Sequence, residues 1–257
     1  MHFAVHTNND LLNLISQLKQ RDNAMKNASL VWLGHSTFQI TTPSGKVVLV
    51  DPFLSGNPQL SEELKTPSQV DAIFLTHGHE DHVGDTLDLA SRFDCPVYGI
   101  VELVGVLQSH GLKREQAVGF NKGGTVHFDD VSVTMVHAQH SSSYRGEYAG
   151  EAAGLVFRVH KAWTFYHMGD TNAFADMELI AEVHEPDVVA VPIGDHYTMG
   201  HVEGALAVEL VEPTIAVPCH YGTFPVLTGD AAEFKRLVER DTQTKVQVPG
   251  VGEAVVL

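Results

Sequence analysis

The chain has 257 residues, of which 44% are hydrophobic and 19% are charged, so it can bury a sizeable core in one or two domains. Its formal net charge of −16 argues against a nucleic-acid or anionic-membrane surface, because either partner would need a basic patch. Cys95 and Cys219 follow no CxxC spacing, and no apolar run approaches the length of a membrane span. We therefore expect a cytoplasmic protein that is neither exported nor inserted in a membrane and does not bind nucleic acid, and a homo-oligomer is compatible with the sequence.

The N-terminal part predicts a helix followed by short strands. Leucines at roughly helical spacing follow a cap at Asn8–Asp10, which predicts an amphipathic helix over residues 9–26. Strands are expected at 30–33 and 38–41, and the turn at 43–46 leads into a strand at 47–50. No interior linker divides the rest of the chain, so we expect an N-terminal helical extension over 1–28 and one domain over 29–257.

The remainder of the chain mixes strands and helices. An apolar run at 72–75 ends at a group of histidines, and residues 83–93 carry a helical pattern. Further strands are expected at 126–128, 131–136, 155–159, 163–167, 188–191 and 215–217, with a helix at 203–211. This order indicates an α/β (α+β) protein with two sheets packed face to face and helices outside, but the pattern alone fits other layerings of helices and sheets.

Residues 76–82, with the sequence THGHEDH, place several metal-ligating side chains in one tight segment after a buried strand. Imidazole and carboxylate are the ligand types that zinc and related divalent metals prefer. An extended backbone would point His77 and His79 the same way, and Asp81 and His82 would face a second metal as the chain turns into a helix. A chance cluster on a surface loop is the alternative, and this concentration of ligand types disfavours it.

The segment THGHEDH resembles the THxHxDH signature of the metallo-β-lactamase superfamily. Further superfamily landmarks follow in the expected order: Asp51, His140, Asp170 and His220. The segments LGHSTF (33–38), HSSS (140–143), YHMGDT (166–171) and PIGDHYTMG (192–200) are similar to the UPF0173-type, UlaG-like metal-dependent hydrolases.

This resemblance implies a four-layer αββα sandwich with two metal ions at the edge of the sheets. Carried over by motif, the ligand set divides between the two ions, with one bridging residue: His77, His79 and His140 for the first, Asp81, His82 and His220 for the second, and Asp170 as the bridge. Such a set leaves each metal open to a shared water. Zinc is the default metal, and manganese, iron, cobalt or nickel would also suit these ligands.

Several residues near these motifs allow more than one role. His137 lies three residues before His140, and odd spacing on a strand sends the two to opposite faces, so we expect one ligand and choose His140 on the resemblance. Asp51 would hold a ligating imidazole by its other ring nitrogen or merely cap a turn, and we favour the first role. His35 and His167 each stand beside a family motif, where either a backbone hydrogen bond or substrate contact is expected.

A polar loop at 194–201 suits a pocket wall, in which His196 or Tyr197 would polarise a substrate oxygen; an ordinary loop is the alternative.

The resulting hypothesis is a hydrolase that uses a metal-bridging hydroxide on a small-molecule ester, lactone, amide or phosphodiester. In this hypothesis, Asp81 orients the nucleophile and accepts its proton. The competing hypotheses are a redox di-iron protein on the same fold and a non-catalytic metal-binding module. His79 argues against the first, because such relatives carry a glutamate there, and the intact ligand set argues against the second.

Overall fold

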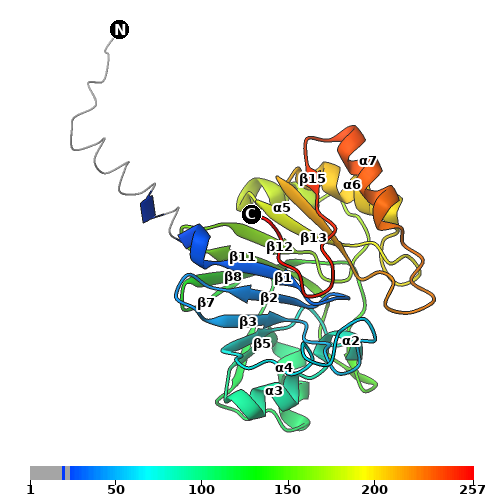
Figure 1. Cartoon of the computed structure of the whole chain (residues 1–257). Helices are drawn as coiled ribbons and strands as arrows, with labels where there is room; N and C mark the ends of the chain where they lie inside the picture. Colours follow the sequence, from blue (N-terminus) through cyan, green and yellow to red (C-terminus); the bar gives the residue numbers. More distant parts are fainter. Residues whose placement is uncertain (1–18, 21–23) are drawn as a thin grey trace.

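The computed structural model describes residues 19–20 and 24–257, in which two β-sheets pack face to face (Figure 1). The six strands of the first sheet follow chain order: β1 (Ser29–Trp32), β2 (Phe38–Thr41), β3 (Val47–Val50), β4 (Ala72–Phe74), β5 (Val97–Ile100) and β6 (Ala117–Phe120). The seven strands of the second sheet lie in the order β15 (Lys245–Val246), β14 (Ile215–Cys219), β13 (Val188–Pro192), β12 (Thr164–His167), β11 (Ala153–Val159), β8 (Val131–His137) and β7 (Thr125–Phe128). A separate hairpin is formed by β9 (Ser143–Tyr144) and β10 (Glu147–Tyr148).

Helices cover the outer face of each sheet (Figure 1). The first sheet carries α3 (Thr86–Phe93) and α4 (Val101–Ser109), and the second carries α5 (Met177–His184), α6 (His201–Val211) and α7 (Ala231–Asp241); the short α2 (Glu80–Val83) lies between β4 and α3 in the chain. Helix α4 packs against β5 and β6, α6 against β13, and α7 against β15. The αββα layering confirms the expected fold class. None of the described helices is long and apolar enough to cross a membrane.

The central strands of the second sheet are buried on both faces. Along β11, Leu155 and Phe157 point into the core between the sheets, whereas Val156 points into a second core beneath the helices α5 to α7. The same alternation places Phe165 of β12 in the first core and Tyr166 in the second. Side chains on a strand alternate between its faces, so a sheet covered on both sides requires strands that are apolar throughout.

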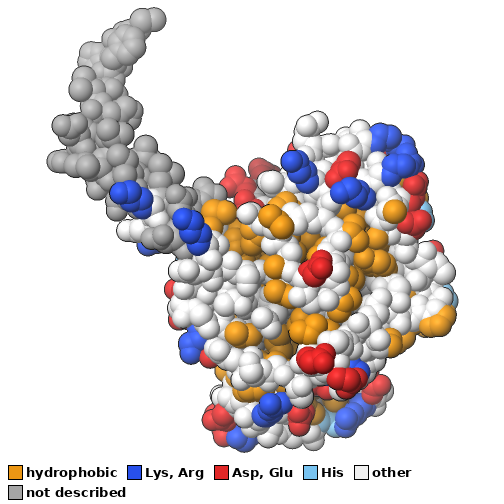
Figure 2. Space-filling view, viewed as in Figure 1, with side chains coloured by type: hydrophobic (Ala, Val, Ile, Leu, Met, Phe, Trp, Pro, Cys, Tyr) orange, Lys and Arg blue, Asp and Glu red, His pale blue; other side chains and the backbone are white. Residues whose placement is uncertain are grey.

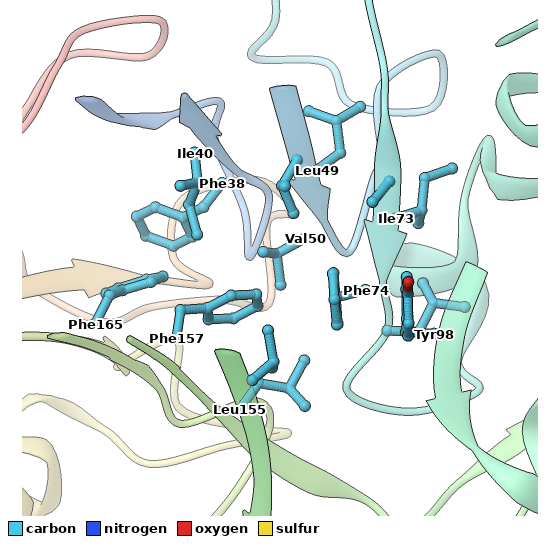
Figure 3. Close-up of a cluster of buried hydrophobic side chains, with 14 of the residues drawn as sticks. Phe38, Ile40, Leu49, Val50, Ile73, Phe74, Tyr98, Leu155, Phe157 and Phe165 are labelled. Atoms are coloured by element: carbon cyan, nitrogen blue, oxygen red, sulfur yellow. The ribbon is translucent and has the colours of Figure 1, made fainter. Parts of the chain in front are cut away.

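Aromatic side chains from both sheets meet in the core between them (Figure 3). The ring of Phe74 stacks on Tyr98 with 4.3 Å between centroids and meets Phe157 of the opposite sheet edge-on at 5.4 Å. Phe38 and Phe165 make a second contact across the sheets, at 5.2 Å. These contacts set the two sheets at a defined spacing and hold their edges in register.

Most strands predicted from the sequence are present within one or two residues of the expected bounds. The helix expected over 83–93 is wrong in detail, since two helices occupy 80–93 and separate at Gly84. Gly84 has a φ of +44°, and a Cβ there would lie 2.4 Å from the carbonyl oxygen of Pro52. Of the helix expected over 9–26, only residues 19–20 and 24–26 are described, and they are helical. The division into an extension over 1–28 and a domain over 29–257 stays a prediction.

Sequence patterning did not predict β5, α4, β6, α5, α7, β15 or the hairpin of β9 and β10. Strand β5 runs directly into α4, without turn residues between Ile100 and Val101, so their joint apolar run has no single periodicity. Helix α7 is hard to predict for a different reason: most of its residues are polar, and only Phe234 and Val238 are buried, so its apolar pattern is weak. Tertiary packing decides these elements.

Acidic and basic side chains are interspersed on the face drawn in Figure 2. On α7, Lys235 lies 3.3 Å from Glu239, and Arg236 lies 2.7 Å from Glu233. Exposed pairs of this kind contribute little to stability, but they neutralise the basic side chains of the helix.

The approach of Gly194 to His220 provides a test of this packing. A Cβ at Gly194, just beyond β13, would lie 2.0 Å from the carbonyl oxygen of His220. We expect Gly194→Ala to displace the loop after β14 and to lower the free energy of unfolding by about 1–3 kcal/mol, measured by chemical denaturation. Gly105→Ala in α4 is the control, since a Cβ there meets nothing within 4 Å; it should be neutral or stabilising by up to about 1 kcal/mol. Equal stability of the two variants would contradict the prediction.

Candidate metal centre

The candidate site lies where several strands of both sheets end. Strands β3 and β4 run parallel, as do β12, β13 and β14, so each set delivers its following loops to one edge. The loops that follow these strands carry the metal-ligating candidates: Asp51 after β3, His77 and His79 after β4, Asp170 after β12 and His220 after β14. Asp81 and His82 stand on α2, and His140 follows β8. Residues far apart in the chain thereby come together.

Three histidines form a first cluster at this edge. Donor atoms of His77, His79 and His140 all lie within 4.8 Å of one another. The Nε2 atom of His77 is 3.0 Å from Nδ1 of His79, and the ring centroids of the three are separated by 4.6 to 5.2 Å. Three imidazoles therefore converge on one position.

A second cluster lies beside the first. It contains Asp81, His82, His220 and His35, whose donor atoms also fall within 4.8 Å of one another. The Oδ2 atom of Asp81 is 3.7 Å from Nε2 of His220 and 4.0 Å from Nε2 of His82. The Asp81 side chain is 30% exposed, whereas those of His82 and His220 are buried. Asp81 is thus the acidic group of this cluster that reaches solvent.

Asp170 lies between the two clusters. Its Oδ2 atom is within 4 Å of an Nε2 atom of four imidazoles: His220 at 3.2 Å, His82 at 3.3 Å, His140 at 3.6 Å and His77 at 3.9 Å. The side chain is only 3% exposed. One buried carboxylate therefore faces donor atoms of both clusters, which is the arrangement that a bridging ligand requires.

Burial and neighbouring charges shift the pKa values of the clustered histidines in opposite directions. Burial alone would lower the pKa of His82, but the carboxylates of Asp170, Asp51 and Asp81 raise it well above its ordinary value. Burial is likewise outweighed at His220, where Asp170 raises the pKa to about 9. Burial lowers the pKa of His77 well below its ordinary value. In the metal-free protein, protons on His82 and His220 therefore compensate the carboxylates, and a bound metal would have to displace them.

The donor set fits a pair of divalent cations. His82 Nε2, His220 Nε2 and Asp170 Oδ1 are buried and make no hydrogen bond among the described residues. Buried polar atoms without partners are costly, and the two imidazole nitrogens lie 3.3 and 3.2 Å from Oδ2 of Asp170. Imidazole nitrogen and carboxylate oxygen are the ligands of zinc and of related divalent metals. The site chemistry is therefore that of a metal centre.

Asp51 and Thr76 orient two of the imidazoles. Asp51 accepts hydrogen bonds from the Thr76 backbone at 2.8 Å, from the Thr76 hydroxyl at 2.6 Å and from Nδ1 of His82 at 2.7 Å. Since the Thr76 hydroxyl donates to Asp51, it accepts from Nδ1 of His77 at 3.0 Å. Both imidazoles consequently direct Nε2 toward the cluster, which is how outer partners set the tautomer of a ligating histidine.

The backbone of the site adopts conformations that side chains disfavour. His35, Asp51 and His220 have φ values of +51°, +45° and +54°. Asp195 and His196, in the adjoining loop, also have positive φ values. Non-glycine residues in this region cost free energy and persist only where the surrounding structure imposes them, as at functional sites.

The other candidates from the sequence lie outside the clusters. His137 ends β8 with its side chain exposed against Phe174. His167 is buried; its Nε2 donates to the Ser36 carbonyl and its Nδ1 accepts from the Gly169 backbone, so it bonds only to backbone. This is one of the two roles that the sequence left open. His196 and Tyr197 lie on an exposed loop.

Several residues that support the site carry no signal in the sequence. Thr76 stands within the signature, and its hydroxyl joins Asp51 to His77. Ser142 accepts from the backbone of Gly78 and donates to the carbonyl of Ala149, which fixes the loop between His77 and His79. Thr223 contacts Nδ1 of His35 at 2.9 Å. Serine and threonine are too common in loops for their sequence positions to indicate such roles.

Comparisons with known proteins agree with this geometry. A family model described as a beta-lactamase superfamily domain matches residues 46–221. A UPF0173 metal-dependent hydrolase of Koribacter versatilis is 44% identical over 219 residues, covering 84% of this chain and 93% of the relative. Another of that name, from Methanosarcina mazei, is 41% identical over 239 residues and covers 91% and 100%. Igni18, a metallo hydrolase from Ignicoccus hospitalis, has a solved structure that aligns with a TM-score of 0.79 and 34% identity over 89% of this chain and 97% of its own.

The matched region includes the loops that follow β3, β4, β12 and β14, and with them most of the clustered residues. Both the sequence match and the structural alignment extend over more than two thirds of the chain. The resemblance seen in the sequence is therefore confirmed, and the chain belongs to the beta-lactamase superfamily, in its UPF0173 branch.

Proposed function

We propose that this protein is a metal-dependent hydrolase with a dinuclear centre. The observation that carries the proposal is the position of the Asp170 carboxylate, whose Oδ2 atom lies 3.2 to 3.9 Å from four imidazole nitrogens belonging to two clusters. Homologues of more than 40% identity are named metal-dependent hydrolases, which supports the assignment as a metal-dependent hydrolase but does not bear on the number of metal ions.

The residues that would hold the metals follow from the two clusters. The first ion would be held by His77, His79 and His140, the second by Asp81, His82 and His220, with Asp170 shared. When bound, such ions would supply a water of lowered pKa, toward about 7, and Lewis-acid stabilisation of negative charge on the substrate. Zinc is the first candidate, and manganese, iron, cobalt and nickel accept the same ligands.

Asp81 is the residue to which we assign the orientation of the nucleophile. Its side chain reaches solvent, whereas that of Asp170 does not. Burial would raise the pKa of Asp81, but the nearby imidazoles of His82 and His220 and the hydrogen bond from His35 hold it well below its ordinary value. An ionised carboxylate accepts a hydrogen bond from the attacking water and so directs it toward the substrate.

The proposed substrate is a small molecule with an ester, lactone, amide or phosphodiester bond. Lys122, ahead of β7, and Arg145, between β9 and β10, are two basic residues in the segments that flank His140. Lys122 already pairs with Glu151 at 2.8 Å, and Arg145 lies over the ring of Tyr144 at 5.1 Å. Since a paired lysine is less available to a phosphate, we would begin a substrate panel with lactones and esters.

Metal content tests the centre directly. Protein purified without a tag or added metal should contain about two equivalents of metal by mass spectrometry. We expect His77→Ala and Asp170→Asn each to lose most of the bound metal, because each removes a donor that the remaining ligands cannot replace. His137→Ala is the matched control, since this histidine lies outside both clusters and should leave metal content unchanged.

Activity should follow metal content. Wild type and His137→Ala should hydrolyse at least one member of a panel of lactones, esters, amides and phosphodiesters, and a chelator should abolish this hydrolysis. Absence of stoichiometric metal after reloading would refute the dinuclear centre. Two bound metals without activity on the panel would refute the hydrolase proposal and leave the metal site.

The support given by Asp51 provides a second prediction. In Asp51→Asn, an amide group replaces an oxygen that accepts from Thr76 or His82, which leaves a buried donor opposed to another donor. We expect the free energy of unfolding of the metal-free protein to fall by about 1–3 kcal/mol. Metal affinity, measured by chelator competition, should fall about 10- to 100-fold.

Asp71→Asn is the control for this substitution. Asp71 also accepts from a backbone amide, that of Val47 at 2.9 Å, and pairs with Lys46 at 3.0 Å, but it lies far from the clusters in a partly exposed position. Loss of its exposed ion pair should cost about 0–1 kcal/mol and leave metal affinity unchanged. Equal metal affinity in wild type and Asp51→Asn would show that Asp51 does not orient a ligand.

A further inference from the structure

His35 stands at the second cluster without belonging to the ligand set that the family motif implies. It lies in the turn between β1 and β2 and is fully buried. Its Nε2 atom is 3.0 Å from Oδ2 of Asp81, closer than Nε2 of either His220 or His82. Its Nδ1 atom is 2.9 Å from the hydroxyl of Thr223. The imidazole therefore joins a hydroxyl on one side to a proposed metal ligand on the other.

The ring of His35 stacks beside a proposed ligand rather than converging with it. Its centroid lies 4.0 Å from that of His220, with 39° between the planes. The rings of the first cluster, which converge on one position, are 4.6 to 5.2 Å apart. Imidazoles bound to one ion at about 2.0–2.1 Å with a roughly tetrahedral angle have centroids roughly 5 Å apart. The spacing of His35 is thus too short for a ring that shares an ion with His220.

Aromatic rings fix the plane of His35. Phe53 and Phe224 each meet it edge-on with 5.6 Å between centroids. The positive φ of His35 adds a backbone constraint. Its side chain is consequently held toward Asp81 by packing as well as by hydrogen bonds.

The hydrogen-bond geometry assigns the ring protons. A cationic imidazole is disfavoured beside two divalent ions, so a neutral ring with one N–H is expected in the metal-bound protein. If that hydrogen were on Nδ1, the lone pair of Nε2 would face a carboxylate oxygen of Asp81 at 3.0 Å. With the hydrogen on Nε2, the ring donates to Asp81 and accepts the single hydroxyl hydrogen of Thr223 at 2.9 Å, a shorter contact than the 3.2 Å between that hydroxyl and Oε1 of Gln59. The second arrangement satisfies both contacts.

We propose that His35 is a positioning residue for the second metal: its Nε2–H holds the carboxylate of Asp81 in the orientation that ligates, and the Thr223 hydroxyl fixes the tautomer. This inference rests on the proposed dinuclear centre. It makes the pair Thr223 and His35 the counterpart of Thr76 and Asp51, which hold the ring nitrogens of His77 and His82. Without the donor at Nε2, the partly exposed carboxylate of Asp81 on α2 would be free to rotate away from the ion.

The test measures metal binding in the full-length protein, independently of hydrolysis. Zinc stoichiometry and the dissociation constants of both ions would be determined by chelator competition for wild type, His35→Leu, His35→Gln and Thr223→Val. We expect His35→Leu to weaken the second ion about 10- to 100-fold and to leave the first nearly unchanged. In His35→Gln, the side-chain amide places a donor near the position of Nε2, so most of the affinity should return. Thr223→Val should give an intermediate loss.

Thr244→Val is the matched control for Thr223→Val. The Thr244 hydroxyl is also buried and donates to the carbonyl of Pro213 at 2.6 Å, but it lies before β15, away from the clusters. It should leave both dissociation constants unchanged. Thermal unfolding of each metal-free variant shows whether it folds. If His35→Leu does not fold, the dissociation constants of Thr223→Val and His35→Gln still decide the test.

The optical spectrum of the cobalt-substituted protein separates positioning from ligation. We expect the spectra of His35→Gln and wild type to agree, because no nitrogen ligand is lost. Unchanged affinity for the second ion in His35→Leu would overturn the proposal. So would a His35→Gln variant that is as weak as His35→Leu and has an altered cobalt spectrum, since His35 would then be a ligand. Failure of wild type to bind metal would refute the dinuclear centre and this inference together, whereas metal binding without hydrolysis would refute only the enzymatic proposal.

Discussion

The buried carboxylate of Asp170 sets the physical problem that the surrounding structure solves. An ionised carboxylate that is 3% exposed is costly unless opposite charges and hydrogen bonds compensate it. Here compensation comes from imidazoles of four separate loops and helices, which approach its Oδ2 atom to within 3.2 to 3.9 Å. In the metal-free protein, protons on His82 and His220 supply the balancing charge. Divalent ions would supply it more fully, which couples metal binding to the release of those protons.

The imidazoles can converge on Asp170 only if other residues, which do not face the cluster, hold their rings in place. Asp51 and Thr76 hold His82 and His77 by their Nδ1 atoms, and Ser142 ties the loop between His77 and His79 to the segment after His140. These contacts decide which ring nitrogen points inward. The positive φ values of Asp51 and His220 indicate that the loops accept backbone strain to present their side chains. Much of what specifies the site therefore lies one layer behind it.

The packed sheets hold the strained loops in place. The central strands of the second sheet bury both faces, and aromatic contacts such as Phe74 with Phe157 lock it to the first sheet (Figure 3). Strand ends anchored in two cores have little freedom to relax, so the loops that follow them inherit defined positions. Gly194 belongs to the same design, because only a residue without a side chain lets the end of β13 approach the backbone of His220.

The sequence by itself determined what is local. Residues 76–82 bring several ligand types into one segment, and strands with strong apolar patterning, such as those expected at 47–50 and 188–191, are predicted because their apolar residues are the ones that become buried. Its resemblance to the metallo-β-lactamase superfamily supplied the fold class and the expected ligands. Elements with mixed signals, namely β5 with α4 and the polar helix α7, were missed because packing rather than periodicity specifies them. Only the tertiary structure decided that His140 joins the first cluster and His137 does not, that His167 bonds to backbone, and that His35 meets both Asp81 and Thr223. The reason is that these contacts depend on the pairing of strands distant in the chain, and the local sequence around a residue does not specify which distant strand end will lie beside it.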